Sequence, residues 1–185
     1  MTWLEEASRS LYASWLLLIR DTDGYRHFSQ TEAGFWRSFS AILIIAPLYL
    51  YAGTVQIVLP DEPAPVSPSI VAAMVGLVLQ WIGWPLAMVP IARWLGLAHA
   101  YARYIIAYNW SSVLVVAVMV PPLMLLDIGL IGPGFAALVA FVLTLVALYY
   151  RWYVALTAFG TTGIVAAALV VADVVLSLLI NTLLG

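Results

Sequence analysis

Asp173 is the one ionisable residue predicted to lie deep within an apolar helix. An ionised carboxylate at the centre of a membrane span costs about 2.5–3.5 kcal/mol on insertion scales, so it should be neutral or face a polar partner. Counting 1.5 Å per residue from Thr161 places Asp173 about 18 Å from one end of its span. Gln80 lies about 21 Å deep when counted back from Trp94, and its amide can both donate and accept. We therefore expect Asp173 and Gln80 to form an intramembrane polar pair.

This polar pair has two interpretations. It is either a proton- or ion-coupling site or an interhelical hydrogen bond that holds the second and fifth spans together. A transport site normally recruits several polar groups at one depth, and only Ser111 and Ser177 are further candidates here. The shortage of polar partners favours the structural interpretation.

Two prolines lie within the predicted second span, Pro85 and Pro90. Each lacks an amide donor and leaves a carbonyl one turn earlier without its helical partner, so both positions predict a helix kink. Such a kink either lines a cavity or is a passive packing feature of a membrane helix.

A second polar group is expected near one end of the third span, where Asn109 and Ser111 must find partners within the bundle. Together with Arg151 from the end of the fourth span they could line a shallow pocket on the cytoplasmic side. Ordinary hydrogen bonding between helices is the alternative interpretation.

Residues suited to catalysis or metal binding are scarce. The chain has no cysteine and two histidines, His27 and His99, and neither has a second ligand at metal-helix spacing. Nucleotide-binding loops and nucleophile elbows are absent from the sequence. We therefore expect a non-enzymatic protein without a catalytic residue, metal or cofactor.

The composition of the 185 residues excludes a water-soluble domain. Hydrophobic residues make up 65% of the chain, charged residues make up 9%, and the mean hydropathy is +1.06. A net charge of -2 with scattered arginines also excludes the dense basic surface that nucleic-acid binding requires. Lipid and other membrane subunits, or further copies of the chain, are the expected partners.

The elements that must position these residues are helices. Residues 1–35 form a predicted cytoplasmic lead, and residues 36–185 form a transmembrane domain. In the lead, apolar residues recur at steps of three and four, which predicts an interfacial amphipathic helix: Leu4, Ala7, Leu11, Trp15 and Leu18. Apolar segments of sufficient length predict spans at about 36–59, 69–94, 103–126, 133–153 and 162–184. The expected fold class is all-α, a bundle of five transmembrane helices with an interfacial helix in front.

All seven arginines fall on one face of this layout, and the chain has no lysine. They are Arg9, Arg20, Arg26, Arg37, Arg93, Arg103 and Arg151. The predicted loops on the other face carry only the acidic residues Asp61, Glu62 and Asp127. By the positive-inside rule, the N-terminus should be cytoplasmic and the C-terminus outside. Preference for arginine with abundant alanine, valine and glycine is typical of a GC-rich bacterial genome, so we expect the bacterial inner membrane.

The segment from Pro85 to Gly96, followed by Tyr101, Arg103 and Tyr108, resembles the turn between the second and third spans of bacterial Yip1-domain proteins. The amphipathic lead and five spans are similar to that family in layout, although the Asp-Leu-Tyr-Gly-Pro signature of its trafficking members is absent. The resemblance implies a small membrane protein that acts through protein or lipid partners.

Two function classes follow from these observations. The first is a non-enzymatic membrane scaffold or accessory subunit, favoured by the few polar residues in the spans and the short loops. The alternative is a small proton- or ion-coupled transporter or channel that uses Asp173 and Gln80.

Overall fold

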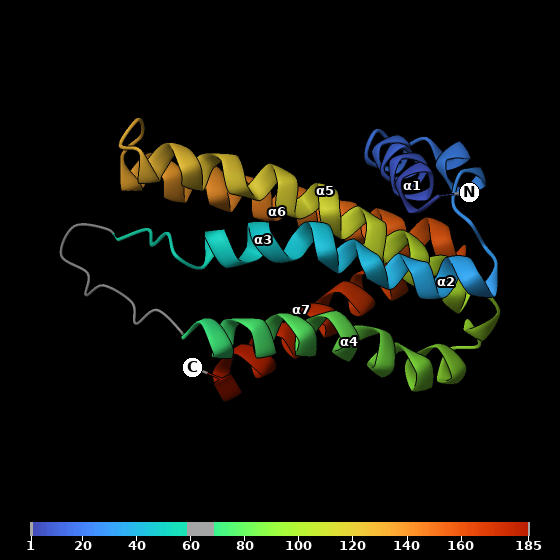
Figure 1. Ribbon diagram of the computed structural model, residues 1–185. Coiled ribbons are helices and arrows are strands. Elements are labelled where there is room, and N and C mark those ends of the chain that lie inside the picture. Colours follow the sequence, from blue (N-terminus) through green and yellow to red (C-terminus); the bar gives the residue numbers. More distant parts are fainter. Residues whose placement is uncertain (1, 59–68, 185) are drawn as a thin grey trace.

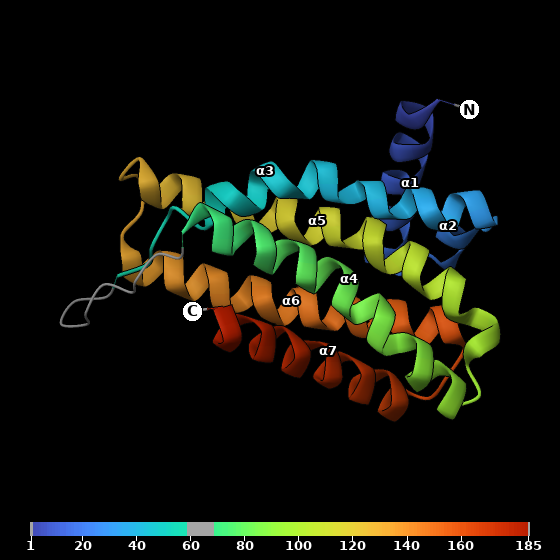
Figure 2. The ribbon, with the colours of Figure 1, turned by 60° about the horizontal axis from the view of Figure 1, so that its bottom comes forward.

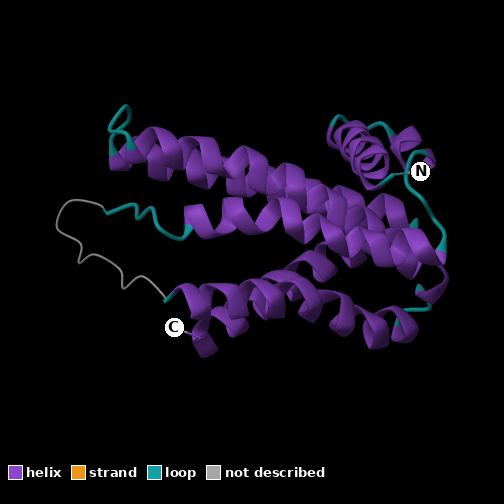
Figure 3. Cartoon of the chain, in the orientation of Figure 1, coloured by secondary structure: helices purple, strands orange, loops and turns teal. Residues whose placement is uncertain are grey.

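The computed structural model describes residues 2–58 and 69–184, and within these ranges the chain is helical with no strand (Figure 3). The α-helices are α1 (Trp3–Leu18), α2 (Glu32–Ser38), α3 (Ile42–Ala52), α4 (Ile70–Trp94), α5 (Tyr101–Asp127), α6 (Pro133–Phe159) and α7 (Gly163–Leu184). Short 3-10 turns lie between them: η1 (Thr22–Arg26), η2 (Phe39–Ala41) and η3 (Ala98–Ala100). Five helical segments in the described ranges are long and apolar enough to cross a membrane.

The predicted spans agree with these segments to within a few residues, except at both ends of the first span, which begins at Glu32, and at the end of the fourth. The first span consists of α2, η2 and α3 and ends at Ala52, earlier than expected, where a turn begins and the Thr54 hydroxyl donates to the Tyr51 carbonyl at 2.7 Å. The fourth span continues to Phe159, six residues beyond its predicted end. The predicted proline-rich loop at 60–68 lies outside the described residues.

Local sequence explains where the helices begin and end. The Ser69 hydroxyl accepts from the Ala72 amide at the start of α4, and Pro133 occupies the first turn of α6, where its missing amide costs no hydrogen bond. At the start of α2 the capping side chain is Thr31, which accepts from the Gly34 amide at 3.0 Å. Gly160 ends α6 with φ 61°, a left-handed conformation that glycine adopts readily.

The spans are arranged in two layers (Figure 1). α5 packs against α3 and α6, and α7 packs against α6 and α4. In Figure 1, α4 and α7 lie below α3, α5 and α6, and the two layers separate toward the end of the bundle where the C-terminus lies. Among the spans that pack closely against one another, α4 and α7 are the farthest apart in sequence.

α1 crosses the long axis of the bundle at the end where α2 begins (Figure 2). Its buried face consists mainly of small and polar residues that pack toward α5 and α6: Glu6, Ala7, Ser10, Ala13, Ser14, Leu16 and Leu17. Leu4 and Trp15, which were expected to belong to one embedded apolar face with Ala7, are exposed on the protein surface. Small side chains are needed on the packed face because α1 lies close against two other helices.

Hydrogen bonds and an ion pair attach the N-terminal region to the bundle. Arg37 contacts the buried Glu6 carboxylate at 2.8 Å, and the Tyr150 hydroxyl donates to the Ser14 carbonyl at 2.6 Å. The Tyr25 hydroxyl lies 3.1 Å from the Val154 carbonyl oxygen. Burial, which disfavours the phenolate, raises the pKa of Tyr25 to about 12.

Candidate intramembrane polar site

Arg151 and Asp173 form a buried ion pair inside the bundle. Nη1 of Arg151 contacts Oδ2 of Asp173, and the Asp173 side chain is only 4% exposed. The Tyr108 hydroxyl lies 3.1 Å from both carboxylate oxygens and accepts from Arg151 Nη1 at 3.2 Å. Each charge therefore has an opposite charge and a hydroxyl as partners, which offsets the cost of its burial.

The short turn between α6 and α7 brings the two charges together. Arg151 lies eight residues before Phe159, and Asp173 lies ten residues after Gly163. At 1.5 Å per residue, these positions are about 12 Å and about 15 Å from the same end of the bundle. Antiparallel neighbours joined by a tight turn thus place the arginine and the aspartate at one depth.

Aromatic packing holds Tyr108 in place. Its ring lies 5.8 Å from the Tyr104 ring and 6.4 Å from the Trp84 ring, measured between centroids. The Trp84 indole donates to the Tyr104 hydroxyl at 2.8 Å, and both side chains are buried. α4 and α5 therefore fix the hydroxyl that bridges the ion pair.

Asp173 and Gln80 do not form the predicted pair in the structure. The Gln80 amide instead donates to Oδ1 of Asn181 at 2.7 Å, eight residues farther along α7 than Asp173, which is about two helical turns. Asp173 bonds to Arg151 and Tyr108 because α6 reaches Phe159 and carries Arg151 into the span. An arginine satisfies an ionised carboxylate better than an amide can.

A cavity of about 190 Å³ lies beside the ion pair, and all five spans contribute to it. Its lining residues are Ile45, Tyr49, Leu77, Gln80, Trp81, Tyr108, Ser112, Val116, Arg151 and Ser177. Gln80 and Ser177, which the sequence indicated as polar groups in the spans, thus share a cavity with Arg151. A polar space of this size accommodates several water molecules or a small solute.

The predicted cytoplasmic-side group of Asn109, Ser111 and Arg151 does not line this cavity as a unit. Nδ2 of Asn109 donates to the Ser38 hydroxyl at 2.9 Å, which joins α5 to α2. The Ser111 hydroxyl donates to the Tyr108 carbonyl at 3.0 Å. Asn109 and Ser111 therefore form hydrogen bonds between and within helices, which was the alternative to a shared pocket. Successive residues on a helix face different directions, and Tyr108 and Ser112 are the polar α5 residues that face the cavity.

α4 continues as one helix through Pro85 and Pro90. Pro85 lacks the amide that would bond to the Trp81 carbonyl, and Trp81 lines the cavity. The Tyr101 hydroxyl donates to the Pro85 carbonyl at 2.9 Å, which fastens this part of α4 to α5. Pro85 therefore lies one turn beyond a residue that lines the cavity, whereas Pro90 lies farther along α4, and neither proline lines the cavity itself.

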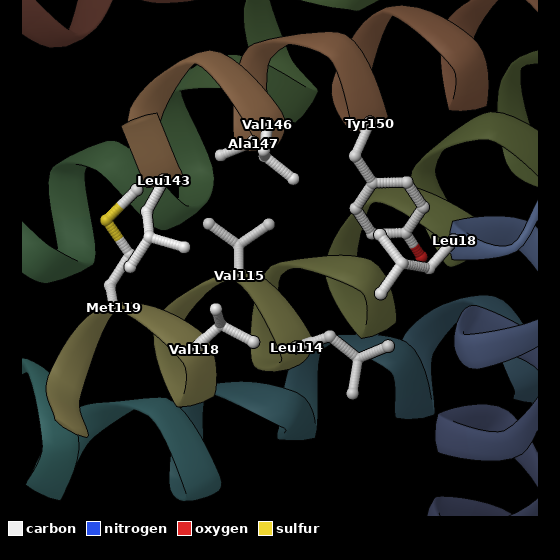
Figure 4. A pocket seen from close by; sticks show the side chains of 9 residues that line it. All are labelled: Leu18, Leu114, Val115, Val118, Met119, Leu143, Val146, Ala147 and Tyr150. Carbon is white, nitrogen blue, oxygen red and sulfur yellow. The ribbon is translucent and has the colours of Figure 1, made fainter. Parts of the chain in front are cut away.

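A second, apolar pocket of about 80 Å³ lies between α5 and α6 (Figure 4). Figure 4 shows Val115 and Val118 of α5 facing Leu143 and Val146 of α6, with Leu18 of α1 near one end. Its walls are almost entirely hydrocarbon, so it offers no polar group to a ligand.

Fold and site together define a helical membrane protein with an ion pair and a polar cavity among its spans. Within the described ranges, no group of three or more histidine, cysteine, aspartate or glutamate side chains is arranged to hold a metal ion. No protein-family model, curated protein or solved structure matches the chain.

Proposed function

We propose that this protein binds a small polar solute in the cavity beside Arg151 and carries it across the membrane. The observation that supports this proposal is the convergence of all five spans on one polar cavity that reaches a charged pair. Binding sites near the midplane, lined by several helices, are typical of transporters.

Packing considerations support the same proposal. Helices that serve only as a scaffold gain most from close contact, and a void of this size gives up dispersion contacts on every wall. Here the void is lined by Gln80, Ser112 and Ser177 in addition to Tyr108 and Arg151. These groups are suited to holding water or a polar ligand.

Cysteine labelling in membranes tests whether water reaches the cavity. The chain has no cysteine, so Ser177→Cys introduces a single thiol into the cavity wall without background. Leu178→Cys is the matched control, because Leu178 is adjacent on α7 but 58% exposed on the outer surface. Thiols react as thiolates, which form in water and not in hydrocarbon. We expect a membrane-impermeant methanethiosulfonate to label Ser177→Cys and to leave Leu178→Cys unlabelled. Equal lack of labelling at both positions would contradict the transport proposal.

A scaffold or accessory subunit without enzymatic activity is the second candidate. The hydrogen bond between Gln80 and Asn181 supports it, because Asn181 is exposed on the outer surface of α7. Polar side chains exposed to lipid favour association with another helix, in a partner subunit or a second copy. The resemblance to the Yip1-domain family, which implies a protein that acts through partners, favours this second candidate.

The proposed orientation has the N-terminus in the cytoplasm of a bacterium and the C-terminus outside the inner membrane, with α1 lying at the cytoplasmic interface. Supporting this orientation, three arginines precede the first span, Arg37 lies near its start, and Arg93 and Arg103 flank the turn between α4 and α5. Arg151 is paired within the bundle and adds less to this signal. A reporter fused after Gly185 should report the outer compartment, and a cytoplasmic signal would reverse the orientation.

A further inference from the structure

We propose that the cavity takes a small monovalent oxyanion of the carboxylate class, bound on Arg151 together with one proton. This inference rests on the proposed transport function and names its substrate class. It follows from the hydrogen-bonding capacity of one guanidinium group and from the charge of the site.

Arg151 has more donors than its protein partners use. A guanidinium carries five N–H groups, and two of them are on Nη1. Within the described part of the chain, the hydrogen bonds of Arg151 to Asp173 and Tyr108 both leave from Nη1. Nε and Nη2 therefore present an edge of the guanidinium that has no protein acceptor there.

The side chain that carries this edge lines the cavity. The Arg151 side chain is 26% exposed and lines the cavity, whereas Asp173 is 4% exposed and does not line it. The N–H of Nε and one N–H of Nη2 form a fork that matches the two oxygens of a carboxylate. The hydroxyls of Ser112 and Ser177 and the amide of Gln80 are further polar groups on the walls.

The charge of the site requires a proton to accompany the anion. Arg151 and Asp173 sum to zero, so a bound monovalent anion leaves one negative charge within the spans. Titratable groups facing this region are few: α5 presents Tyr104 and Tyr108, α6 presents Arg151, α7 presents Asp173, α3 presents Tyr49, and α4 has no titratable residue between Ile70 and Ala92. The described part of the chain therefore places no second cation beside this region, and protonation of Asp173 restores neutrality.

Tyr108 provides the route for this proton. Its hydroxyl borders the cavity and donates to Asp173. In the proposed step, Tyr108 passes its proton to a carboxylate oxygen of Asp173 and takes another from a hydronium ion in the cavity. The net change is one proton gained by Asp173 while the anion replaces the carboxylate charge beside Arg151.

Calorimetry on the full chain in phosphatidylcholine nanodiscs tests the inference, with lactate as the probe and lactamide as the neutral control of similar shape. Titration in two buffers of different ionisation enthalpy measures the protons taken up. We expect lactate to bind with close to one proton and lactamide to bind at least about tenfold more weakly. Asp173→Asn should bind lactate without proton uptake, and the double variant Arg151→Gln with Asp173→Asn, which leaves no unpaired charge, should lose lactate binding.

The outcomes separate this inference from the transport proposal. Absence of lactate binding, or equal binding of lactate and lactamide, would overturn the anion assignment, even where Ser177→Cys is labelled and the cavity is shown to be wet. Lactate binding without proton uptake in the unmodified protein would overturn the coupling to Asp173. If phosphatidylserine in the nanodiscs abolished lactate binding, a lipid headgroup and not a soluble anion would be the ligand.

Discussion

Two arginine–carboxylate pairs differ in where the arginine is placed. In the pair of Arg37 and Glu6, which joins α2 to α1, the carboxylate side chain is 3% exposed and the arginine is 51% exposed. In the pair of Arg151 and Asp173 the exposed fractions are 4% and 26%. Both carboxylates are buried, but Arg37 lies at the surface of the bundle and Arg151 lines the cavity among the spans. The first arginine can be solvated without its partner, whereas the second depends on what enters the cavity.

The largest effect is expected from breaking the inner pair. Asp173→Leu leaves Arg151 without a counter-charge among the spans, which should lower the free energy of unfolding by about 3–5 kcal/mol. Asp173→Asn, which retains a hydrogen-bond acceptor for Tyr108, is the matched control and should cost less. Unfolding by denaturing detergent in mixed micelles measures both. Equal stability of Asp173→Leu and the unmodified protein would show that Arg151 is solvated through the cavity.

Breaking the outer pair should have a smaller effect. Glu6→Gln removes the charge from the buried carboxylate, and Arg37 can turn to water or to lipid headgroups, so we expect a loss of about 1 kcal/mol. The loss should appear in α1 first, as faster hydrogen exchange between Trp3 and Leu18. Protection of α5 and α6 should stay unchanged. A loss as large as that of Asp173→Leu would remove the distinction between the two pairs.

A neutral polar pair tests whether charge is what distinguishes the inner site. Gln80→Leu removes the hydrogen bond to Asn181, which in a membrane is worth on the order of 0.6–2 kcal/mol. The unfolding transition should shift by that amount without change in the exchange of α1. Thermal or detergent unfolding of Gln80→Leu, compared with Asn181→Leu, should give similar losses, because either change removes the same bond.

A comparably small effect at neutral pH is expected at Tyr25, which attaches the N-terminal region to α6. Tyr25→Phe removes its hydrogen bonds to Val154 and Thr157 and should cost about 1 kcal/mol. Because burial raises the pKa of Tyr25 to about 12, the neutral phenol contributes stability that is fully present below pH 10 and lost as the pH rises through 12. Tyr25→Phe should reduce this alkaline sensitivity. Protease cleavage before Glu32, followed against pH, measures it, and identical pH profiles would contradict the prediction.

The five spans could be predicted from the sequence, whereas the inner ion pair was missed. Apolar segments of span length predicted the five membrane-crossing helices, because burial in hydrocarbon acts on each segment alone. The inner ion pair was missed because the fourth span was predicted to end at 153, which placed Arg151 at the membrane boundary and not within the bundle. The apolar run from Val154 to Phe159, followed by a helix-ending glycine at 160, is the signal that carries Arg151 inward.

The partner of Gln80 and the orientation of α1 depend on tertiary contacts, which the periodicity of apolar residues in the sequence does not reveal. Asp173 and Gln80 do lie on neighbouring helices, but depth alone does not show which polar residue of α7 bonds to Gln80. The orientation of α1 depends on which of its faces packs against the bundle. The face with small residues packs more closely than the face with large apolar ones.

The pairing of α4 with α7 has a consequence for synthesis of the chain. Residues 95–162 separate the two helices, and at about 5–20 residues per second they take roughly 3–14 s to make. During this interval α4 stays in the bilayer without its main partner, and Arg151 is inserted before Asp173 exists. A ribosome that stalls ahead of α7 therefore leaves an arginine without its counter-charge in the membrane, a defect that quality-control proteases can recognise in an incomplete chain and not in a finished one.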